Sequence, residues 1–564
     1  MRGYLILLSL QLIHFPLKAG DYFVAPEGTP FGNGTPSAPY DLLSALSGIL
    51  GGAGDTFWLR GGDYHLGHLV SSVHGLPDAP LTFRQVRGER ARVDATLTLF
   101  NSPGYVVFRD FELYSSDTNR LSSQIGVGFN VTDITILPGI GCYSPNMSFI
   151  NLVIHDQTRH GIYTSQTASN VLIYGCIIFN NGWASPDNAE GHGIYAQGQL
   201  GTRTLAENLI FNNAGGNVHV YENGVGKFLC GVNLEGNVAF HAGALQNVRA
   251  YRDWIVGVDA PALYTDQIQL KHNLGYAPGP VNPRAVVQLG RDATNGSIVL
   301  EDNYLPLGLV MSNWHSATVC GNFIAPQVKS DYAVALDESL CNLNAVWDNN
   351  TYLVANGGNQ VLLNSGPCSF FSWQVETGFD LGSTFALGSL LGTRVFLRTN
   401  AYEQGRAQIT VYNWDQAPVV SVDLRAVLSP GCGFELRNVQ DWFAEPVLRG
   451  VYQGQMLQLP MTNLTVAAPT APLLTPAPTG PEFNTFLLQL VPEAVRISRL
   501  PDAVEVSWPI GAGADGLVCS DSVAPPGVWT SPSTTPGLAG DRYTISEPTG
   551  AQARFYRLRD GMTH

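Results

Sequence analysis

The chain of 564 residues has few charged side chains and, beyond its N-terminus, no long apolar run. Asp, Glu, Lys and Arg make up 13% of the residues, about half the share typical of globular proteins. This scarcity argues against long helices with charged outer faces, and the 61 glycines indicate a turn-rich β-structure instead. Because no further run of about 18 apolar residues exists, the sequence predicts no membrane insertion.

Basic residues are scarce as well, and the formal net charge is −15. No stripe of Lys and Arg crosses the chain, so nucleic acid is a poor partner. The eight cysteines are dispersed without Cys-x-x-Cys or Cys/His metal spacing, and Cys341 could pair with either Cys320 or Cys368 in an exported protein. HExxH, Walker and G-x-S-x-G motifs are missing too, which excludes the best-known zincin, nucleotide-binding and esterase signatures.

A degenerate repeat runs through the middle of the chain. It reads apolar–x–apolar–x–x–Asn–apolar–x–apolar and returns roughly every 20–35 residues. Its Asn position is occupied by Asn151, Asn208, Asn237, Asn273, Asn303, Asn322 and Asn350, with Cys176 in one coil. Period-2 alternation makes each unit a strand that must stack on copies of itself, which predicts a parallel β-helix. We expect the Asn residues to form a structural ladder of side-chain amides.

The first 20 residues are typical of a secretory signal peptide. Arg2 forms the positive start, Tyr4 to Phe15 the apolar core, and Ala19 or Gly20 a small residue for cleavage. We therefore expect a secreted or cell-surface protein, and we expect it to be a monomer.

After the signal, DYFVAPEGTPFGNGTPSAPYDLLSAL predicts a strand, a Gly/Pro-rich turn and an amphipathic helix near Tyr40–Leu50 that covers the first coil. With the repeat, this opening resembles secreted right-handed parallel β-helix proteins of the pectate-lyase-like superfamily, over roughly Asp21 to Phe370. The resemblance implies a carbohydrate-active protein whose partner is a polysaccharide.

The pattern changes after about Phe370, where longer alternating strands predict a β-sandwich. This part resembles the accessory sandwiches of glycoside-active enzymes. It includes the Pro/Thr-rich segment APTAPLLTPAPTGPEF, which predicts an extended loop. We expect a signal peptide at 1–20, the β-helix at 21–375, the sandwich at 376–493 and a small C-terminal β-domain at 494–564, similar to C-terminal modules of secreted bacterial proteins.

The densest polar and aromatic cluster lies between His155 and Tyr251. HGIYTSQ, GHGIYAQG and GGNVHVYENG align by their turn glycines, and QNVRAYRD follows as a fourth segment. Period 2 then points Ile162, Ile194, Val218 and Val248 inward, and likewise Thr164, Ala196, Val220 and Ala250. One predicted outward column holds Tyr163, Tyr195, His219 and Arg249. The other holds Ser165, Gln197, Tyr221 and Tyr251, and Gln288 could extend one of the two.

A long insertion, NNGWASPDNAEGH, enters this patch between two coils and brings Trp183, Asp187, Glu190 and His192. The Gly–His–Gly triplet around His192 resembles one found in polygalacturonases, whose carboxylate motifs do not appear upstream in matching form. Glu222 and Asp253 stand near opposite ends of neighbouring strands.

Two chemistries fit these residues. For a lyase, Arg249, with Arg252, would neutralise a uronate carboxylate. Either His219 or Tyr195 would remove the proton, and the other would donate one to the leaving oxygen. For a hydrolase, two of the carboxylates would act as a pair, drawn from Asp187, Glu190, Glu222 and Asp253. A third hypothesis is a non-catalytic glycan-binding or adhesin solenoid. β-Elimination is preferred because Arg249 and His219 share one predicted column.

A Tyr/His pair needs no metal, so we expect no required cofactor, with calcium possible. The catalytic candidates are Tyr195, His219, Arg249, His192, Glu190 and Asp187. The substrate-binding candidates are Tyr163, Trp183, Gln197, Tyr221, Glu222, Tyr251, Arg252 and Gln288.

Overall fold

The structure is a computed structural model. It describes residues 19–277, 286–291, 293–326, 332–336, 344–491, 495–509, 516–521, 529–540, 542–548 and 554–558. Most of the expected signal peptide and the expected partner Cys341 lie outside these ranges. Among the described residues, no helix is long and apolar enough to cross a bilayer.

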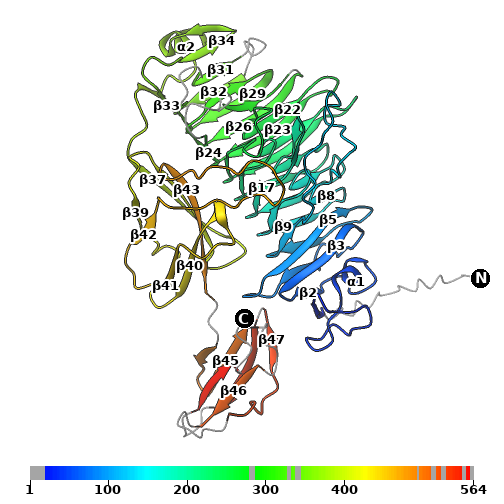
Figure 1. Cartoon of the computed structure of the whole chain (residues 1–564). Helices are drawn as coiled ribbons and strands as arrows, with labels where there is room; N and C mark the ends of the chain where they lie inside the picture. The colour runs from blue at the N-terminus through cyan, green and yellow to red at the C-terminus, as the bar shows by residue number, and fades with distance from the viewer. Residues whose placement is uncertain are drawn as a thin grey trace, which may run out of the picture.

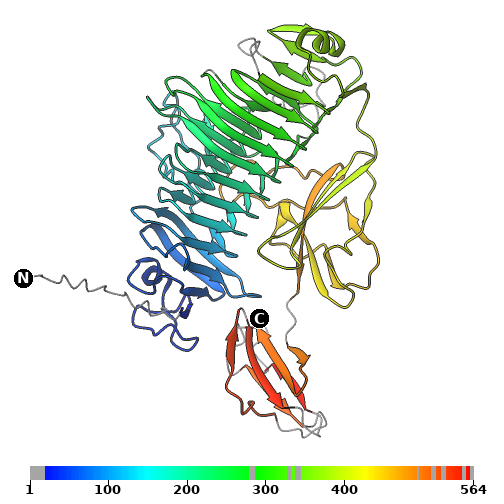
Figure 2. The same ribbon diagram turned by 180° about the vertical axis from the view of Figure 1, so that it is seen from behind.

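The larger part of the chain winds into a right-handed parallel β-helix, as the repeat predicts (Figures 1 and 2). Each coil contributes strands to three faces, and every coil pairs in parallel with the next. The first face is a 12-stranded sheet of β1 (Asp21–Val24), β2 (Thr56–Leu59), β4 (Leu81–Gln85), β6 (Val106–Arg109), β9 (Met147–Ile150), β12 (Val171–Tyr174), β17 (Arg203–Ala206), β20 (Leu229–Glu235), β23 (Thr265–Lys271), β26 (Asn295–Glu301), β29 (Trp314–Cys320) and β32 (Asn344–Asp348).

The second and third faces join at the long strand β5, which pairs with both β7 and β8. The second face holds β7 (Glu112–Tyr114), β10 (Val153–His155), β13 (Ile177–Phe179), β18 (Leu209–Phe211), β21 (Val238–Phe240), β24 (Leu274–Tyr276), β27 (Tyr304–Leu305), β30 (Phe323–Ile324), β33 (Thr351–Val354) and β36 (Thr384–Leu387). The third holds β3 (Gly62–Ser71), β5 (Ala91–Leu99), β8 (Ile140–Cys142), β11 (Ile162–Thr164), β16 (Ile194–Ala196), β19 (Val218–Glu222), β22 (Trp254–Val258), β25 (Val286–Leu289), β28 (Gly308–Met311), β31 (Val334–Leu336) and β34 (Val361–Leu363).

The asparagine ladder forms along the turn between the first and second faces. Asn208 Nδ2 donates to Asn237 Oδ1 at 2.8 Å, and Asn237 Nδ2 donates to Asn273 Oδ1 at 3.0 Å. The series continues through Asn303, Asn322 and Asn350. Each amide also satisfies buried backbone groups, so the ladder stabilises one sharp turn per coil.

Asn151 is not part of the ladder, and its assignment from sequence was wrong by one residue. Val153 pairs with Ile177, so Leu152 and Cys176 occupy the ladder position. Asn151 instead adopts a left-handed conformation, with φ of 54°. Glu207 has the same conformation one residue before Asn208, with φ of 55°. Asn suits this left-handed position because its short side chain tolerates positive φ, whereas the ladder position needs the amide for the bonds between coils.

Helices cover both ends of the β-helix (Figure 1). As predicted, α1 (Leu42–Leu46) lies at the first coils and buries Leu42 and Leu46 in their core. At the other end, α2 (Phe370–Thr377) buries Trp373, whose Nε1 donates to Asp380 at 2.9 Å. Asp380 also accepts from Asn350, so it ends the ladder.

The predicted β-sandwich follows and packs along the second face of the β-helix (Figures 1 and 2). Its larger sheet holds β37 (Thr393–Thr399), β38 (Ala407–Asn413), β43 (Phe483–Leu490), β40 (Gly433–Asn438) and β41 (Leu448–Val451), and its smaller sheet holds β39 (Val419–Val422) and β42 (Leu457–Pro460). One apolar cluster joins the two bodies: Phe483 packs on both Phe240 and Tyr276, with ring centres 5.0 and 4.3 Å apart.

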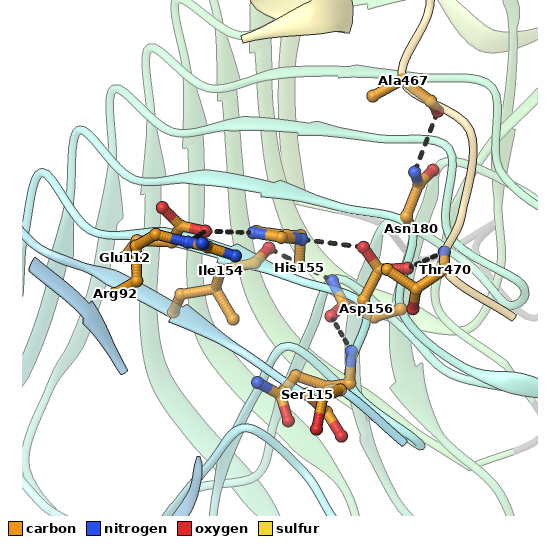
Figure 3. Close-up of polar contacts among 12 residues, drawn as sticks. Arg92, Glu112, Ser115, Ile154, His155, Asp156, Asn180, Ala467 and Thr470 are labelled. Atoms are coloured by element: carbon orange, nitrogen blue, oxygen red, sulfur yellow. Dashed lines mark hydrogen bonds and ion pairs between the residues drawn. The ribbon is translucent and has the colours of Figure 1, made fainter. Parts of the chain in front are cut away.

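The Pro/Thr-rich segment lies against the β-helix. The Thr470 amide donates to Asp156 at 2.8 Å, and Asn180 Nδ2 donates to the Ala467 carbonyl at 3.0 Å (Figure 3). Further along, the Leu474 amide donates to the Leu245 carbonyl at 3.0 Å. The extended segment therefore fixes the sandwich to the coils.

The C-terminal β-domain returns to the beginning of the chain. It holds β44 (Arg496–Arg499), β45 (Ala503–Pro509), β48 (Arg542–Pro548) and β47 (Gly537–Ala539) in one sheet, with β46 (Leu517–Ser520) and β49 (Phe555–Leu558) in a second. An apolar cluster joins Phe23, Trp58 and Val86 of the first coils to Trp508 and Tyr543 of this domain.

Candidate active site on the third face

The register predicted for the third face is confirmed over three coils. Ile162 pairs with Ile194 and Ile194 with Val218, and all three side chains are fully buried. The residues that follow them point outward, which places Tyr163, Tyr195 and His219 side by side on the outer face. Thr164, Ala196 and Val220 are buried in the core, as expected.

These outward rings belong to a longer row, which we call the aromatic track. Neighbouring ring centres in it are 4.7–6.2 Å apart. The track runs through Phe100, Tyr143, Tyr163, Tyr195, His219 and Tyr221. A row of rings across successive coils can pack against the faces of consecutive sugar units.

Sequence reasoning missed the first two rings of the track. Phe100 and Tyr143 are 47% and 37% exposed, so they offer open ring faces. A signal was present: Gly139–Ile140 repeats the Gly–Ile pair before Tyr163 and Tyr195, and Ile140 pairs with Ile162. That pair aligns Gly141 with Tyr163, so it could have placed Tyr143 two residues further along the neighbouring coil, diagonal to Tyr163.

The fourth coil was misaligned, and the columns predicted for Arg249 and Tyr251 are wrong. Ile255 pairs with His219, and Gly257 pairs with Tyr221. The QNVRAYRD segment lies in the loop between β21 and β22, so it has no strand register to share. Val248 and Ala250, expected inside, are both exposed. Gln288 does extend the first column, because it pairs with Ile255 in the next coil.

Arg249 nevertheless lies at the rim of the site. Its Nη1 donates to Asn188 Oδ1 of the insertion at 2.9 Å. The guanidinium lies 5.0 Å from the centre of the Phe129 ring and 5.6 Å from that of Tyr251. The loop thus brings Arg249 to the insertion, one ring away from the histidines.

Three histidines form a contiguous group beneath Tyr195. The His192 ring stacks on His160 with centres 5.1 Å apart, and His219 meets His192 edge-on at 4.3 Å. His192 Nδ1 lies 3.2 Å from the Gly216 carbonyl, which can only accept, so Nδ1 donates and Nε2 accepts. His219 Nδ1 lies 2.9 Å from that Nε2 and therefore donates to it. This chain of bonds leaves Nε2 as the unprotonated nitrogen of His219.

The protonation states follow from burial. Burial lowers the pKa of His219 well below its ordinary value, and it lowers the pKa of His192 to about 3. His160 shifts in the same direction for the same reason. Burial raises the pKa of Tyr195, whose ring lies 5.0 Å from that of His219. At neutral pH the pair therefore consists of an unprotonated imidazole and a protonated phenol.

The insertion is a supporting hairpin of β14 (Trp183–Ala184) and β15 (Ala189–Glu190). Trp183 cannot bind substrate as predicted, because its side chain is fully buried against Val131 and Ile134. Tyr251 is also buried; its hydroxyl donates to the Ala189 carbonyl and its ring meets His192 edge-on. Both aromatic residues therefore support the site and do not line it.

The four candidate carboxylates do not form an exposed pair. Arg159 binds both oxygens of Glu190, at 3.0 and 3.2 Å, and Asp187 accepts from the Gly126 amide at 2.7 Å. Glu222 is buried and accepts from the amides of the two residues that follow it. Asp253 is buried beside Asn217, and burial raises its pKa to about 7.

Polar contacts at the edges hold the track in place. Tyr163 donates to Gln197 Oε1 at 2.8 Å. Tyr221 donates to Asp259 Oδ2 at 2.9 Å, and Arg291 binds both oxygens of Asp259 while lying 5.4 Å from the Tyr221 ring centre. Ser165 is buried and Arg252 is partly buried.

One group of side chains has the composition of a metal site. Ligand atoms of His160, Glu190 and His192 lie within 4.8 Å of one another. However, Arg159 occupies both oxygens of Glu190, and His219 occupies Nε2 of His192. Two nitrogens and one carboxylate also do not suit calcium, which takes six to eight oxygen ligands. The hydrogen-bonding atoms of Glu190 and His192 thus already have protein partners. That the protein requires no metal stays a prediction.

The fold and this site define a parallel β-helix protein with an aromatic track and a Tyr/His pair on its outer face. No family model matches the sequence, and no curated protein is significantly similar to it. Among solved structures, the chain is similar to pectate lyase Pel9A, with 15% identity over 59% of this chain and 79% of that chain and a TM-score of 0.36.

A GH136 lacto-N-biosidase from Eubacterium ramulus is 13% identical over 66% of this chain and 68% of that chain, with a TM-score of 0.40. The structure of XylC with xylose is 10% identical over 83% and 100%, with a TM-score of 0.39. Values this low assign no function, so the function is argued from the residues of this chain.

Proposed function

We propose that this protein is an exported enzyme that binds a polysaccharide along the aromatic track and cleaves it beside Tyr195 and His219. The observation that carries the proposal is the Tyr195–His219 pair, with ring centres 5.0 Å apart. Partly or fully exposed rings on both sides of the pair would hold sugar units in register, and an acid and a base at one point allow proton transfer.

The preferred reaction is β-elimination of an acidic polysaccharide. His219 Nε2 takes the proton from C5 of a uronate, the electrons form the C4–C5 double bond, and the C4–O bond breaks. Tyr195 gives its proton to the leaving oxygen. The pKa shifts support this assignment of roles. The pKa of His219 is lowered, so its imidazole is unprotonated, and the pKa of Tyr195 is raised, so its phenol keeps its proton.

The uronate carboxylate must be neutralised for its C5 proton to become acidic. Arg249 no longer shares a column with His219, so that argument from sequence falls away. The two arginines at the edges of the site, Arg249 beside Tyr251 and Arg291 beside Tyr221, are the candidates that remain. The Tyr195–His219 pair therefore supports the elimination mechanism more strongly than the arginines that would neutralise the uronate carboxylate.

The test is a screen of the protein without its first 20 residues on acidic and neutral polysaccharides. Ultraviolet absorbance of unsaturated products and new reducing ends are read together. Both signals should rise, and His219→Ala and Tyr195→Phe should each lower them by roughly 10²–10⁴-fold. His65→Gln is the matched control, because His65 is an exposed residue paired with Asp94 on an early coil.

The other outcomes separate the alternatives. Reducing ends without absorbance would establish a hydrolase and return attention to Glu190 and Glu222. Retention of the protein on one polymer without cleavage would establish the binding solenoid. If the protein neither cleaves nor binds any of the polymers, the proposal is contradicted.

A further inference from the structure

A cavity of about 840 Å³ lies between the β-helix and the β-sandwich. The β-helix lines it with the coils around Arg84–Glu112 and with Asn151 and Val153. The sandwich lines it with residues around Tyr402–Arg406, Glu435–Arg449 and Gln489–Val491, and the C-terminal domain adds Arg496 and Gly540. This volume falls within the range of natural small-molecule sites. It lies at the turn between the first and second faces, away from the aromatic track on the third face.

The cavity concentrates positive charge in an acidic protein. Eight arginines and six carboxylates line it among the described residues, whereas the whole chain has 30 basic and 45 acidic residues. The carboxylates already have partners: Glu112 is 2.7 Å from Arg90, Asp110 is 2.7 Å from Arg109, and Glu435 is 2.9 Å from Arg449. The positive excess in a concave space attracts anions.

One wall of the cavity is fixed from behind by a buried network. His155 Nε2 lies 3.1 Å from Glu112 and its Nδ1 lies 2.8 Å from Asp156, which in turn accepts from Thr470 (Figure 3). Glu112 is therefore held by His155 on one side and by Arg90 on the other. The wall is built before any ligand arrives.

Arg406 is the one buried arginine among the described residues that line this cavity. Only 5% of its side chain is exposed, and its ion pair with Glu403 is long, at 3.5 Å. Its Nε and Nη2 have no hydrogen-bond partner among the described residues. Buried guanidinium donors without acceptors are unfavourable, and a carboxylate or a sulfate has two oxygens that can accept from one guanidinium at once.

Aromatic side chains line the same space. Arg90 lies 3.7 Å over the ring of Phe443, Trp442 stands beside it, and Tyr402 is 42% exposed. Rings and arginines together match a ligand with an apolar ring face and an acidic group.

We propose that this cavity is a second ligand site, which binds a small acidic ligand through a carboxylate or sulfate seated on Arg406. An acidic sugar and a free inorganic oxyanion share this chemistry. The proposal is independent of cleavage on the aromatic track, and each can fail without the other.

The test is calorimetric titration of the chain lacking its first 20 residues with glucuronate, sulfate and, as a neutral probe, glucose, all at one ionic strength. Glucuronate or sulfate should bind, and glucose should not. Arg406→Met and Arg449→Gln should each weaken binding by about tenfold or more, since charged hydrogen bonds are lost. Arg449 is 58% exposed, so its replacement does not disturb the core.

Arg425→Gln is the matched control: it lies on the same sandwich, is 71% exposed and pairs with Asp423 outside the cavity. Tighter binding of glucuronate than of sulfate would identify a sugar site, and equal binding an inorganic anion site. The proposal is overturned if neither anion binds, if glucose binds as well, or if both cavity variants bind like the control. His219→Ala should bind these anions as the parent protein does, whatever its activity.

Discussion

The Nδ1 atom of His219 lies 2.9 Å from Nε2 of His192, whose own Nδ1 faces the Gly216 carbonyl at 3.2 Å. One backbone carbonyl therefore determines which nitrogen of each ring carries a proton. It leaves His219 with an accepting Nε2, although no carboxylate contacts that ring in the described part of the chain. This arrangement gives a base whose protonation depends on a neutral partner.

His192→Phe should separate orientation from substrate binding. The phenyl ring keeps the stack on His160 but cannot accept from His219, so His219 loses its fixed tautomer. We expect kcat to fall, by less than in His219→Ala, with KM nearly unchanged because His192 is buried away from substrate. Tyr163→Phe is the comparison, and it should change KM more than kcat. Steady-state kinetics on the polymer found in the screen decide this, and an unchanged kcat in His192→Phe contradicts the relay.

The same variant should change how stability depends on pH. The pKa of His192 is about 3 in the folded state against 6.5 ordinarily, so below pH 6.5 only the unfolded chain takes up the proton. Stability from this group is present above the unfolded pKa and falls by about 1.4 kcal/mol per pH unit below it. Denaturant unfolding should show the parent and His192→Phe converging as pH falls; parallel profiles would contradict the neutral histidine.

His155 should show the opposite sign. Its bonds to Glu112 and Asp156 raise its pKa despite burial, so the folded state holds a proton that the unfolded state releases. This stabilisation is complete below the unfolded pKa and is lost as pH rises through the folded pKa. His155→Gln should lower the unfolding free energy by about 3 kcal/mol at about pH 6 and by less at about pH 9.

His65→Gln provides the exposed counterpart to that measurement. His65 pairs with Asp94 at 3.2 Å with 67% of its side chain exposed, so its loss should change stability by less than about 1 kcal/mol. If both variants behave alike, the buried network around His155 has no special role in stability.

A substitution at the centre of the asparagine ladder should destabilise the protein. Asn237→Ala removes one acceptor for Asn208 and one donor each for Asn273 and the Leu205 carbonyl, all of them buried. Leaving buried polar groups unpaired costs about 1–3 kcal/mol each, so we expect a loss of at least about 3 kcal/mol. Asn130→Ala, at an exposed position, should have little effect. Equal midpoints of thermal unfolding for the two variants would contradict a structural ladder.

Much of the β-helix could be predicted because its signals are local and periodic. The ladder from Asn208 onward stands at one fixed place in every repeat, and Tyr163, Tyr195 and His219 each follow a turn by the same short spacing. Asn151 was misplaced because two adjacent positions of the same turn both accept Asn, for different reasons. Sequence spacing cannot distinguish a ladder amide from a left-handed turn residue.

The features that the sequence did not predict have a different cause. They depend on loops and on contacts between distant parts of the chain. Arg249 was placed in a strand that does not exist, since the loop before β22 interrupts the repeat there. Trp183 looked like an exposed ring, but Val131 and Ile134 from another loop cover it. The cavity around Arg406 needs the β-helix, the sandwich and the C-terminal domain to form, so no single segment carries a signal for it.

The C-terminal domain covers an apolar area on the first coils, formed by Phe23, Trp58 and Val86. The first coils are synthesised long before the C-terminal domain, so their apolar area stays uncovered until that domain has folded. A chain truncated before this domain would keep the complete β-helix but expose the apolar area on its first coils. The C-terminal β-domain therefore protects the apolar area of the first coils from aggregation.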